Sequence, residues 1–373
     1  MPLSVFLKRF FAADRKYGSR DRKNIAAICY HYYRLGKAVP GIDTAERIIL
    51  ATFLCEQESN GLLESLRPEW NNHITTTIQQ KLEITGFHVQ DIFPWKDELS
   101  EGIDHLQYAV SFLHQPHLFL RVRPGNKDRV IKKLQEAGLN FSIVYDDCIA
   151  LLNSTKLGGI IEPDQEAVIQ DLNSQKVLDF LKQPVTRTQF PASGHPDPIS
   201  VWDCCAASGG KSILIFDILH GNIDLTVSDI RENILANLDE RFSMAGIGGY
   251  KSFLSDLGRD DCQLPAVPCQ LLICDAPCTG SGTWSRNPEQ LLYFEPDQIG
   301  VYAERQCSIV SHAIAGLQKG GLFFYITCSV FRKENEAVTH FIKEELHLQL
   351  LKAEVLNGYD KGADTMYVAV FRN

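Results

Sequence analysis

The spacing of apolar residues changes along the chain, and each change indicates a different kind of structure. From Leu3 to about Phe87, apolar residues recur every three or four positions, as they do along one side of a helix. Breaks at Gly18, at residues 40–41 and at Pro68 divide this stretch into short helices. The pattern therefore predicts a small helical bundle.

The middle of the chain combines strand and helix patterns. Residues 117–123 read as a short strand, residues 127–137 have helical spacing, and residues 141–152 again favour strands. We therefore expect a small α+β unit. Arg121 and Arg123 share one face of its first strand, where they either contact bases or phosphates or lie on an exposed sheet face.

Beyond residues 158–159, short apolar runs alternate with helical stretches, which is typical of a parallel, doubly wound sheet. The expected strands are 201–202, 223–228, 250–254, 270–274 and 322–326, with helices that include 231–245 and 301–317. The proline-rich segment 184–198 reads as a surface loop before the first of these strands. The predicted fold class is α/β: a Rossmann-like domain over 161–373, preceded by a helical N-terminal region over 1–104 and an α+β unit over 105–160.

Charge is distributed unevenly, which narrows the choice of partner. The 373 residues carry a net charge of −9, yet the first 40 hold nine Lys and Arg against two Asp. A polyanion would therefore meet a local basic patch and not the whole surface. The basic residues of this region either contact RNA phosphates or form a solvated helix face. They are Lys8, Arg9, Arg15, Lys16, Arg20, Arg22, Lys23 and Arg34.

Cysteine usage and hydropathy indicate the compartment. Eleven cysteines without regular spacing argue for a reducing interior, so we expect a cytoplasmic protein. The first apolar run is too short for a signal peptide, and no apolar stretch reaches the length of a membrane span. The basic start leaves a transit peptide as an alternative. We expect no membrane association and a monomer.

Two expected strands end on cysteines. The run 322–326 is followed by Thr-Cys-Ser, which contains Cys328, and the run 271–274 is followed by Asp275, Pro277 and Cys278. Ligands bind at the carboxyl ends of the strands in open α/β sheets. A Cys/Asp/Cys group at that edge suits chemistry on an electron-poor ring. The alternative for each cysteine is inert packing as a small hydrophobic residue.

A third strand end carries small residues and glycines that open a helix, in the sequence DCCAASGGKS at 203–212. Free helix N-terminal amides there can hold an anionic group. A phosphate-binding P-loop is one interpretation, but the required glycine is replaced by Cys205. The other is a methyl-donor site, with Asp229 binding ribose hydroxyls and Asp256 accepting a hydrogen bond from the adenine amino group.

These residues resemble those of the RNA cytosine-5 methyltransferases, typified by the bacterial small-subunit rRNA methyltransferase B and its NOL1-NOP2-Sun relatives in eukaryotes. DCCAASGGKS is similar to the cofactor motif D-x-C-A-A-P-G-G-K-T, DAPCTGSG to D-A-P-C-S-G-x-G, and YITCSVFRKENE to Y-s-T-C-S…E-N-E. The chain departs from the family at Ser208, which replaces the loop proline, and at Thr279, which replaces serine. Its N-terminal region is short for a full NusB-like domain.

The resemblance implies S-adenosylmethionine as cofactor, no metal, and methyl transfer to carbon 5 of a cytosine in RNA, with rRNA expected. It assigns the attack on cytosine carbon 6 to Cys328, release to Cys278, and ring activation to Asp275, aimed by Pro277. It also implies a cofactor site formed by Cys205, Ala206, Ala207, Ser208, Gly209, Gly210, Lys211, Asp229, Asp256 and Asp275. The target cytosine must be single-stranded or flipped out.

Three alternatives stay open at this point. The substrate could be a tRNA cytosine. A DNA cytosine-5 methyltransferase would use Cys278 as its nucleophile, although the presence of Cys328 favours RNA. A catalytically silent RNA-binding factor for ribosome assembly could also have this fold.

Overall fold

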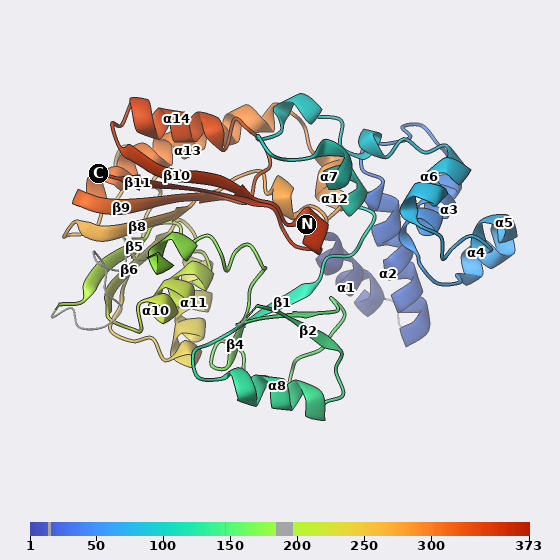
Figure 1. Ribbon diagram of the computed structural model, residues 1–373, viewed down its shortest axis with the longest axis horizontal. Helices are drawn as coiled ribbons and strands as arrows, with labels where there is room; N and C mark the ends of the chain where they lie inside the picture. The colour runs from blue at the N-terminus through green and yellow to red at the C-terminus, as the bar shows by residue number, and fades with distance from the viewer. Residues whose placement is uncertain (14–15, 146, 184–196) are drawn as a thin grey trace. The chain divides into compact units, whose positions relative to one another are not determined.

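The computed structural model describes residues 1–13, 16–145, 147–183 and 197–373, and the chain divides into two compact units (Figure 1). Arg15 and most of the expected proline-rich loop lie outside the described residues. Among the described helices, none has both the length and the apolar character that a bilayer span requires. The division into 1–104, 105–160 and 161–373 stays a prediction.

The first unit comprises Met1–Leu99, Ile103–Gln115 and Thr283–Glu295, and it is helical, as the apolar spacing predicts. Its helices are α1 (Leu3–Ala13), α2 (Ser19–Arg34), α3 (Thr44–Cys55), α4 (Gly61–Leu66), α5 (Pro68–Asn71), α6 (Ile78–Thr85), α7 (His105–Ser111) and α12 (Glu289–Tyr293), with 3₁₀ turns η1 (Val89–Ile92) and η2 (Lys96–Glu98). Local sequence sets the ends of α6: Thr77 and Gln80 form a capping box, and Gly86 closes the helix in the left-handed conformation.

Arg34 holds this unit together and is not available to RNA. Its side chain is buried, and its guanidinium donates hydrogen bonds to the carbonyl oxygens of Phe112 at 2.8 Å and Ser285 at 3.1 Å. The hypothesis of a phosphate contact is therefore wrong for Arg34. Arg20 and Lys23 are exposed, so for them it stays a prediction.

The second unit comprises Ser100–Gly102, Pro116–Gly282 and Pro296–Asn373. Its smaller sheet has the order β2-β3-β1-β4, and all neighbouring strands are antiparallel. The strands are β1 (Leu118–Val122), β2 (Phe141–Tyr145), β3 (Cys148–Leu151) and β4 (Ala167–Ile169), and α8 (Lys127–Glu136) packs Val130 and Leu134 against them. This is the expected α+β unit.

The larger sheet has the strand order β10-β11-β9-β8-β5-β6-β7. Its parallel strands are β5 (Ile199–Asp203), β6 (Ile223–Asp229), β7 (Lys251–Leu254), β8 (Cys269–Asp275) and β9 (Leu317–Thr327), while β10 (Gln349–Leu356) and β11 (Met366–Arg372) are antiparallel. The Rossmann-like prediction is confirmed, and the antiparallel pair is an addition to the predicted sheet.

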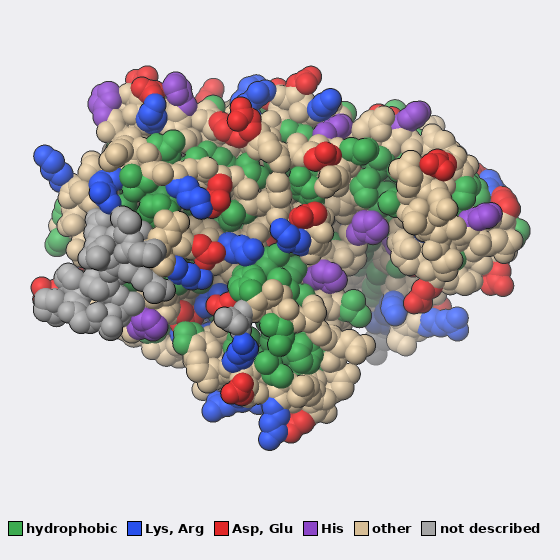
Figure 2. All heavy atoms as spheres, in the orientation of Figure 1, with side chains coloured by type: hydrophobic (Ala, Val, Ile, Leu, Met, Phe, Trp, Pro, Cys, Tyr) green, Lys and Arg blue, Asp and Glu red, His purple; other side chains and the backbone are tan. Residues whose placement is uncertain are grey.

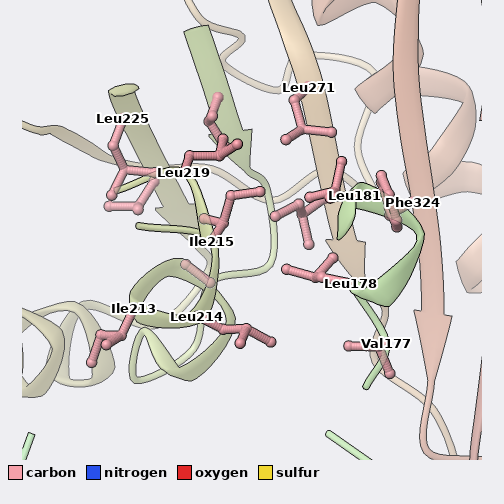
Figure 3. Close-up of a cluster of buried hydrophobic side chains, with 14 of the residues drawn as sticks. Val177, Leu178, Leu181, Ile213, Leu214, Ile215, Leu219, Leu225, Leu271 and Phe324 are labelled. Atoms are coloured by element: carbon pink, nitrogen blue, oxygen red, sulfur yellow. The ribbon is translucent and has the colours of Figure 1, made fainter. Parts of the chain in front are cut away.

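Helices cover both faces of this sheet. Figure 1 shows α10 (Gly210–Ile218) and α11 (Glu232–Ala245) on one face, and α13 (Gln298–Ala313) and α14 (Glu336–Glu344) on the other. On the first face, the 3₁₀ turn η3 (Asp179–Lys182) contributes Leu181, and Leu178 comes directly before this turn. Both side chains pack with Ile215 of α10 against Leu271 and Phe324 of the sheet (Figure 3). Burial of both faces explains why these strands read as continuous apolar runs.

Charged side chains of both signs are intermixed on the molecular surface. On the face drawn in Figure 2, Lys and Arg alternate with Asp and Glu among the described residues.

Candidate active site

The loop between β5 and α10 is held from both sides by neighbouring strands. The Cys204 amide donates to the Ile273 carbonyl of β8 at 2.9 Å, and the Ala206 amide donates to the Ser228 carbonyl of β6 at 3.0 Å. The loop then turns at Gly209, whose φ of 82° is left-handed. A Cβ on Gly209 would lie 2.5 Å from a ring carbon of Phe242, so glycine is required there for space as well as for conformation.

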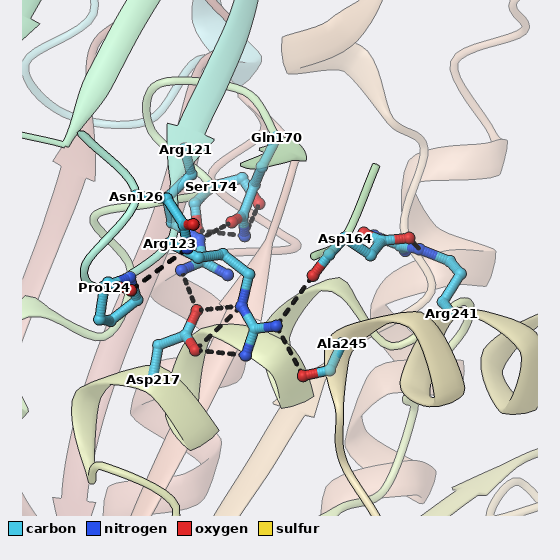
Figure 4. A network of polar contacts seen from close by, with 10 residues as sticks. All are labelled: Arg121, Arg123, Pro124, Asn126, Asp164, Gln170, Ser174, Asp217, Arg241 and Ala245. Carbon is cyan, nitrogen blue, oxygen red and sulfur yellow. Dashed lines mark hydrogen bonds and ion pairs between the residues drawn. The ribbon is translucent and has the colours of Figure 1, made fainter. Parts of the chain in front are cut away.

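Ser208, which departs from the family proline, is tied to the rest of the unit by Arg241. The Arg241 guanidinium donates to the Ser208 carbonyl at 2.8 Å and to its Oγ at 3.0 Å. The same guanidinium forms two hydrogen bonds with the Asp164 carboxylate, at 2.8 and 2.7 Å (Figure 4). The loop therefore has a charged anchor that the motif alone does not reveal.

The helix that follows this loop is anchored by the two arginines of β1. Arg121 Nη1 lies 2.5 Å from one carboxylate oxygen of Asp217 on α10, and Arg123 Nη2 lies 2.8 Å from the other (Figure 4). The Arg121 side chain is 3% exposed. Both earlier interpretations of this pair, RNA contact and an exposed sheet face, are therefore wrong: the arginines join the small sheet to the cofactor-loop helix.

A cavity of about 280 Å³ lies where β5, β6 and β8 end. Six of its lining residues are among the predicted site residues: Cys205, Ala207, Asp229, Asp256, Asp275 and Pro277. Ala206, Ser208, Gly209, Gly210 and Lys211 form the adjoining loop and helix start. The remaining lining residues were not predicted: Cys204, Ile230, Arg231, Ser255, Leu257, Arg305 and Ile309. Arg305 and Ile309 lie one turn apart on α13, a spacing that also fits ordinary helix packing.

Asp229 closes β6 and faces this cavity with its carboxylate already oriented. It accepts hydrogen bonds from the Ala207 amide at 3.0 Å and from the Arg231 amide at 3.0 Å. Burial raises the pKa of Asp229, but the hydrogen bonds from Arg231 and Ala207 outweigh burial and leave the pKa below its usual value. The residue is therefore ionised at neutral pH. Asp256, beyond β7, accepts from the Gly258 amide at 3.1 Å.

The ends of β8 and β9 bring the two predicted cysteines together. These strands are parallel neighbours, with Asp275 paired to Ile326. Cys278 Sγ lies 3.3 Å from Cys328 Sγ, and both thiols are partly exposed. The contact with Cys328 and burial together raise the pKa of Cys278 well above its ordinary value. The two sulfurs are therefore in contact at the ends of neighbouring strands.

One carboxylate, Glu334, holds the two cysteine loops in place. It is fully buried and accepts hydrogen bonds from the Thr279 amide at 2.9 Å, from Ser329 Oγ at 2.5 Å and from Gln306 Nε2 at 3.0 Å. The Thr279 hydroxyl also donates to it, at 2.6 Å, so the replacement of serine by threonine keeps this contact. Burial raises the pKa of Glu334 despite these donors. The E-N-E motif contains Glu334, but the motif alone does not reveal that this carboxylate joins the two cysteine loops.

Lys211, predicted to bind the cofactor, lies against a predicted catalytic residue. Its ammonium is 2.7 Å from the Asp275 carboxylate. Burial lowers the pKa of Lys211, but the attraction of Asp275 is greater and the pKa is raised overall. This ion pair connects the cofactor loop to the end of β8.

Comparison with known proteins finds similarity to a family of methyltransferases. Residues 194–370 match the family model described as 16S rRNA methyltransferase RsmB/F. A protein of Bacillus subtilis (strain 168), described as a probable ribosomal RNA small subunit methyltransferase B, is 28% identical over 234 residues. The aligned part covers 61% of this chain and 50% of that relative. The chain thus spans about half the length of this curated relative.

Solved structures share the fold. The crystal structure of PH0851 has a TM-score of 0.70 at 17% identity and covers 100% of this chain and 95% of that chain. The structure of NSun6 from Pyrococcus horikoshii with SFG has a TM-score of 0.58 at 15% identity, covering 73% and 96%. These likenesses confirm the Rossmann-like fold.

The three motifs that carry the sequence resemblance all fall within the matched range, at the carboxyl edge of the larger sheet. On this evidence, residues 194–370 are similar to the 16S rRNA methyltransferase RsmB/F family, and the similarity covers all three motifs.

Proposed function

We propose that this protein transfers a methyl group from S-adenosylmethionine to carbon 5 of a cytosine in RNA, with small-subunit rRNA as the substrate. The observation that carries the proposal is the 3.3 Å separation of the Cys278 and Cys328 sulfurs beside a cavity at the sheet edge. The names of the family and of its bacterial relative support rRNA as the substrate.

Carbon 5 of cytosine is a weak nucleophile until a group adds to carbon 6. Cys328 is the residue we assign to that addition: its sulfur bonds to carbon 6 and the ring electrons move toward carbon 5. Two thiols in contact do not both ionise readily, and the raised pKa of Cys278 keeps the proton on that residue. The Cys278 thiol can then donate a hydrogen bond to the Cys328 sulfur, 3.3 Å away, as Cys328 attacks.

Asp275 is placed to orient and activate the base. One oxygen of its carboxylate forms the ion pair with Lys211. The remaining lone pairs of the carboxylate can accept hydrogen bonds from the cytosine ring nitrogen or the exocyclic amine. Pro277 restricts the backbone between Asp275 and Cys278 and so limits the freedom of the turn. The bound base would be activated by contacts that are already in place before it arrives.

The cavity fits the methyl donor by the chemistry of its lining. Asp229 offers an ionised acceptor suited to ribose hydroxyls, and Leu257 and Ile309 offer apolar contacts suited to a purine ring. S-adenosylmethionine, when bound, supplies the methyl group as a sulfonium. After transfer, the carbon-5 proton passes to solvent water, the ring double bond re-forms and the bond between carbon 6 and the Cys328 sulfur breaks. Cys278 Sγ lies 3.3 Å from Cys328 Sγ and can assist this release by donating a hydrogen bond to the departing sulfur.

A denaturing gel of labelled target RNA with cofactor and each variant tests these roles. Cys328→Ala should abolish methylation and form no adduct, because no sulfur reaches carbon 6. Cys278→Ala should methylate once and leave RNA attached through Cys328, visible as a nuclease-sensitive shifted band. A band with Cys328→Ala and none with Cys278→Ala would exchange the roles, and no band with either would remove the proposed mechanism.

Mapping of 5-methylcytosine tests the substrate. Total RNA from cells with and without the protein should differ at a position in small-subunit rRNA. A difference confined to tRNA would replace rRNA as the substrate. If no RNA differs and the purified protein still binds RNA, the silent assembly factor would be favoured.

A further inference from the structure

Three cysteines, two of which line the cavity, form a group separate from the proposed catalytic pair Cys278 and Cys328. The Sγ atoms of Cys204, Cys205 and Cys274 all lie within 4.8 Å of one another. Across the described ranges, no other three His, Cys, Asp or Glu side chains come together in this way. The three residues come from two adjacent parallel strands: Cys204 and Cys205 follow β5, and Cys274 lies near the end of β8.

We infer that Cys204, Cys205 and Cys274 form a binding site for one soft, thiophilic cation of the copper(I) class. Thiolate ligands select soft ions such as copper(I), zinc and iron–sulfur clusters. Zinc in structural sites takes four ligands, whereas this group offers three. A three-sulfur set therefore matches a monovalent soft ion better than zinc.

The distances permit coordination with small movements. A metal–sulfur bond of about 2.3 Å places three sulfurs about 4.0 Å apart in a trigonal arrangement. The three Sγ atoms now lie up to 4.8 Å apart, so each pair would have to approach by less than ~1 Å. Rotation of the cysteine side chains can supply this movement. Each thiol that binds releases its proton to solvent, so affinity rises with pH.

The backbone that carries these sulfurs is fixed before any ion arrives. The Cys204 amide bonds to Ile273 next to Cys274, and its carbonyl accepts from Ser228 Oγ at 3.2 Å. Ser228 in turn accepts from the Trp202 indole at 3.0 Å. Cys204 and Cys205 line the cavity, which gives an ion a route to the buried Cys274. Fixed ligands with an entry route are the features expected of a metal site.

Copper(I) competition against a chromogenic chelator, under anaerobic conditions and without cofactor, tests this site. Because Cys278 and Cys328 are also close, the experiment uses the Cys278→Ser/Cys328→Ser double variant as its background. This background should take up one equivalent of copper(I). Adding Cys204→Ser, Cys205→Ser or Cys274→Ser should weaken binding at least tenfold.

The matched control is Cys269→Ser, which changes another buried cysteine of β8 outside the group. It should leave copper affinity unchanged. X-ray absorption on the copper-loaded background, which needs no further substitution, should count three sulfur neighbours. The inference would be overturned if the background variant took up no copper(I), or if X-ray absorption counted two sulfur neighbours. Equal losses of copper affinity in Cys269→Ser and in the group variants would also overturn it. The test measures copper binding and not methyl transfer, so its result does not depend on the proposed reaction.

Discussion

The carboxylate at the end of β5 should make stability fall as pH rises. Asp203 is fully buried, accepts a hydrogen bond from Ser212 Oγ at 2.6 Å on one oxygen, and has no partner on the other among the described residues. Burial raises its pKa from 3.8 to about 7. The folded state therefore binds this proton more tightly than the unfolded state does.

The sign and size of the effect follow from that difference. The stabilising contribution is fully present below pH 3.8 and is lost as pH rises through about 7. At about 1.36 kcal/mol per pKa unit, ionising Asp203 in the folded state costs on the order of 4 kcal/mol above neutral pH. Between pH 5 and pH 8 the expected loss is roughly 2 to 3 kcal/mol.

Asp203→Asn removes the titration while keeping the shape and an acceptor for Ser212. Thermal unfolding at intervals from pH 5 to pH 8, without cofactor, should show the wild-type Tm falling relative to the variant by roughly 5 °C or more. The control is Asp217→Asn, which loses charge pairing with Arg121 and Arg123 and should lower Tm at every pH. Parallel Tm curves for wild type and Asp203→Asn would refute the reasoning.

Three other predictions concern the cofactor loop, the cysteine loops and the basic segment. Asp229→Ala should weaken S-adenosylmethionine binding in calorimetry with the fold unchanged by circular dichroism, and equal affinity would remove Asp229 from the site. Glu334→Ala leaves four donor groups without their acceptor and should destabilise the protein by about 3 kcal/mol or more, with Glu334→Gln losing less; equal denaturation midpoints for both would contradict this. Charge reversal at Arg20 and Lys23 should reduce the salt dependence of RNA binding by about one unit of slope per lost phosphate contact, and an unchanged slope would make the segment a solvated helix face.

Sequence patterns predicted the parallel strands because each is buried on both faces and reads as an apolar run. They did not predict β10 and β11, which follow the last expected strand and return antiparallel beside it. Periodicity also does not reveal the order of the strands across the sheet. In the sheet, β8 lies between β5 and β9, although β6 and β7 come between β5 and β8 in the sequence. That order brings Cys278 to Cys328; the strand ends placed both cysteines at the same edge of the sheet, but they could not show that the two strands are neighbours.

The residues missed by sequence reasoning act through contacts between distant segments. The alternation of Arg121 and Arg123 correctly placed both on one strand face, but it could not show that Asp217, about a hundred positions away, covers that face. The same holds for the cysteine group, in which two adjacent ligands meet a third from the neighbouring strand. No local spacing distinguishes such a group from buried cysteines that only pack.

Ser208 shows how such long-range contacts can replace a local one. The family proline stiffens the cofactor loop by fixing one backbone angle, an effect worth about 0.4 to 1 kcal/mol when the native conformation permits it. Ser208 gives up that restriction and accepts two hydrogen bonds from the Arg241 guanidinium. A hydrogen bond to a charged group contributes about 1.5 to 3 kcal/mol. The hydrogen bond to Ser208 Oγ, which a proline could not accept, therefore offsets the lost restriction, and the Arg241 that donates it is itself held by Asp164.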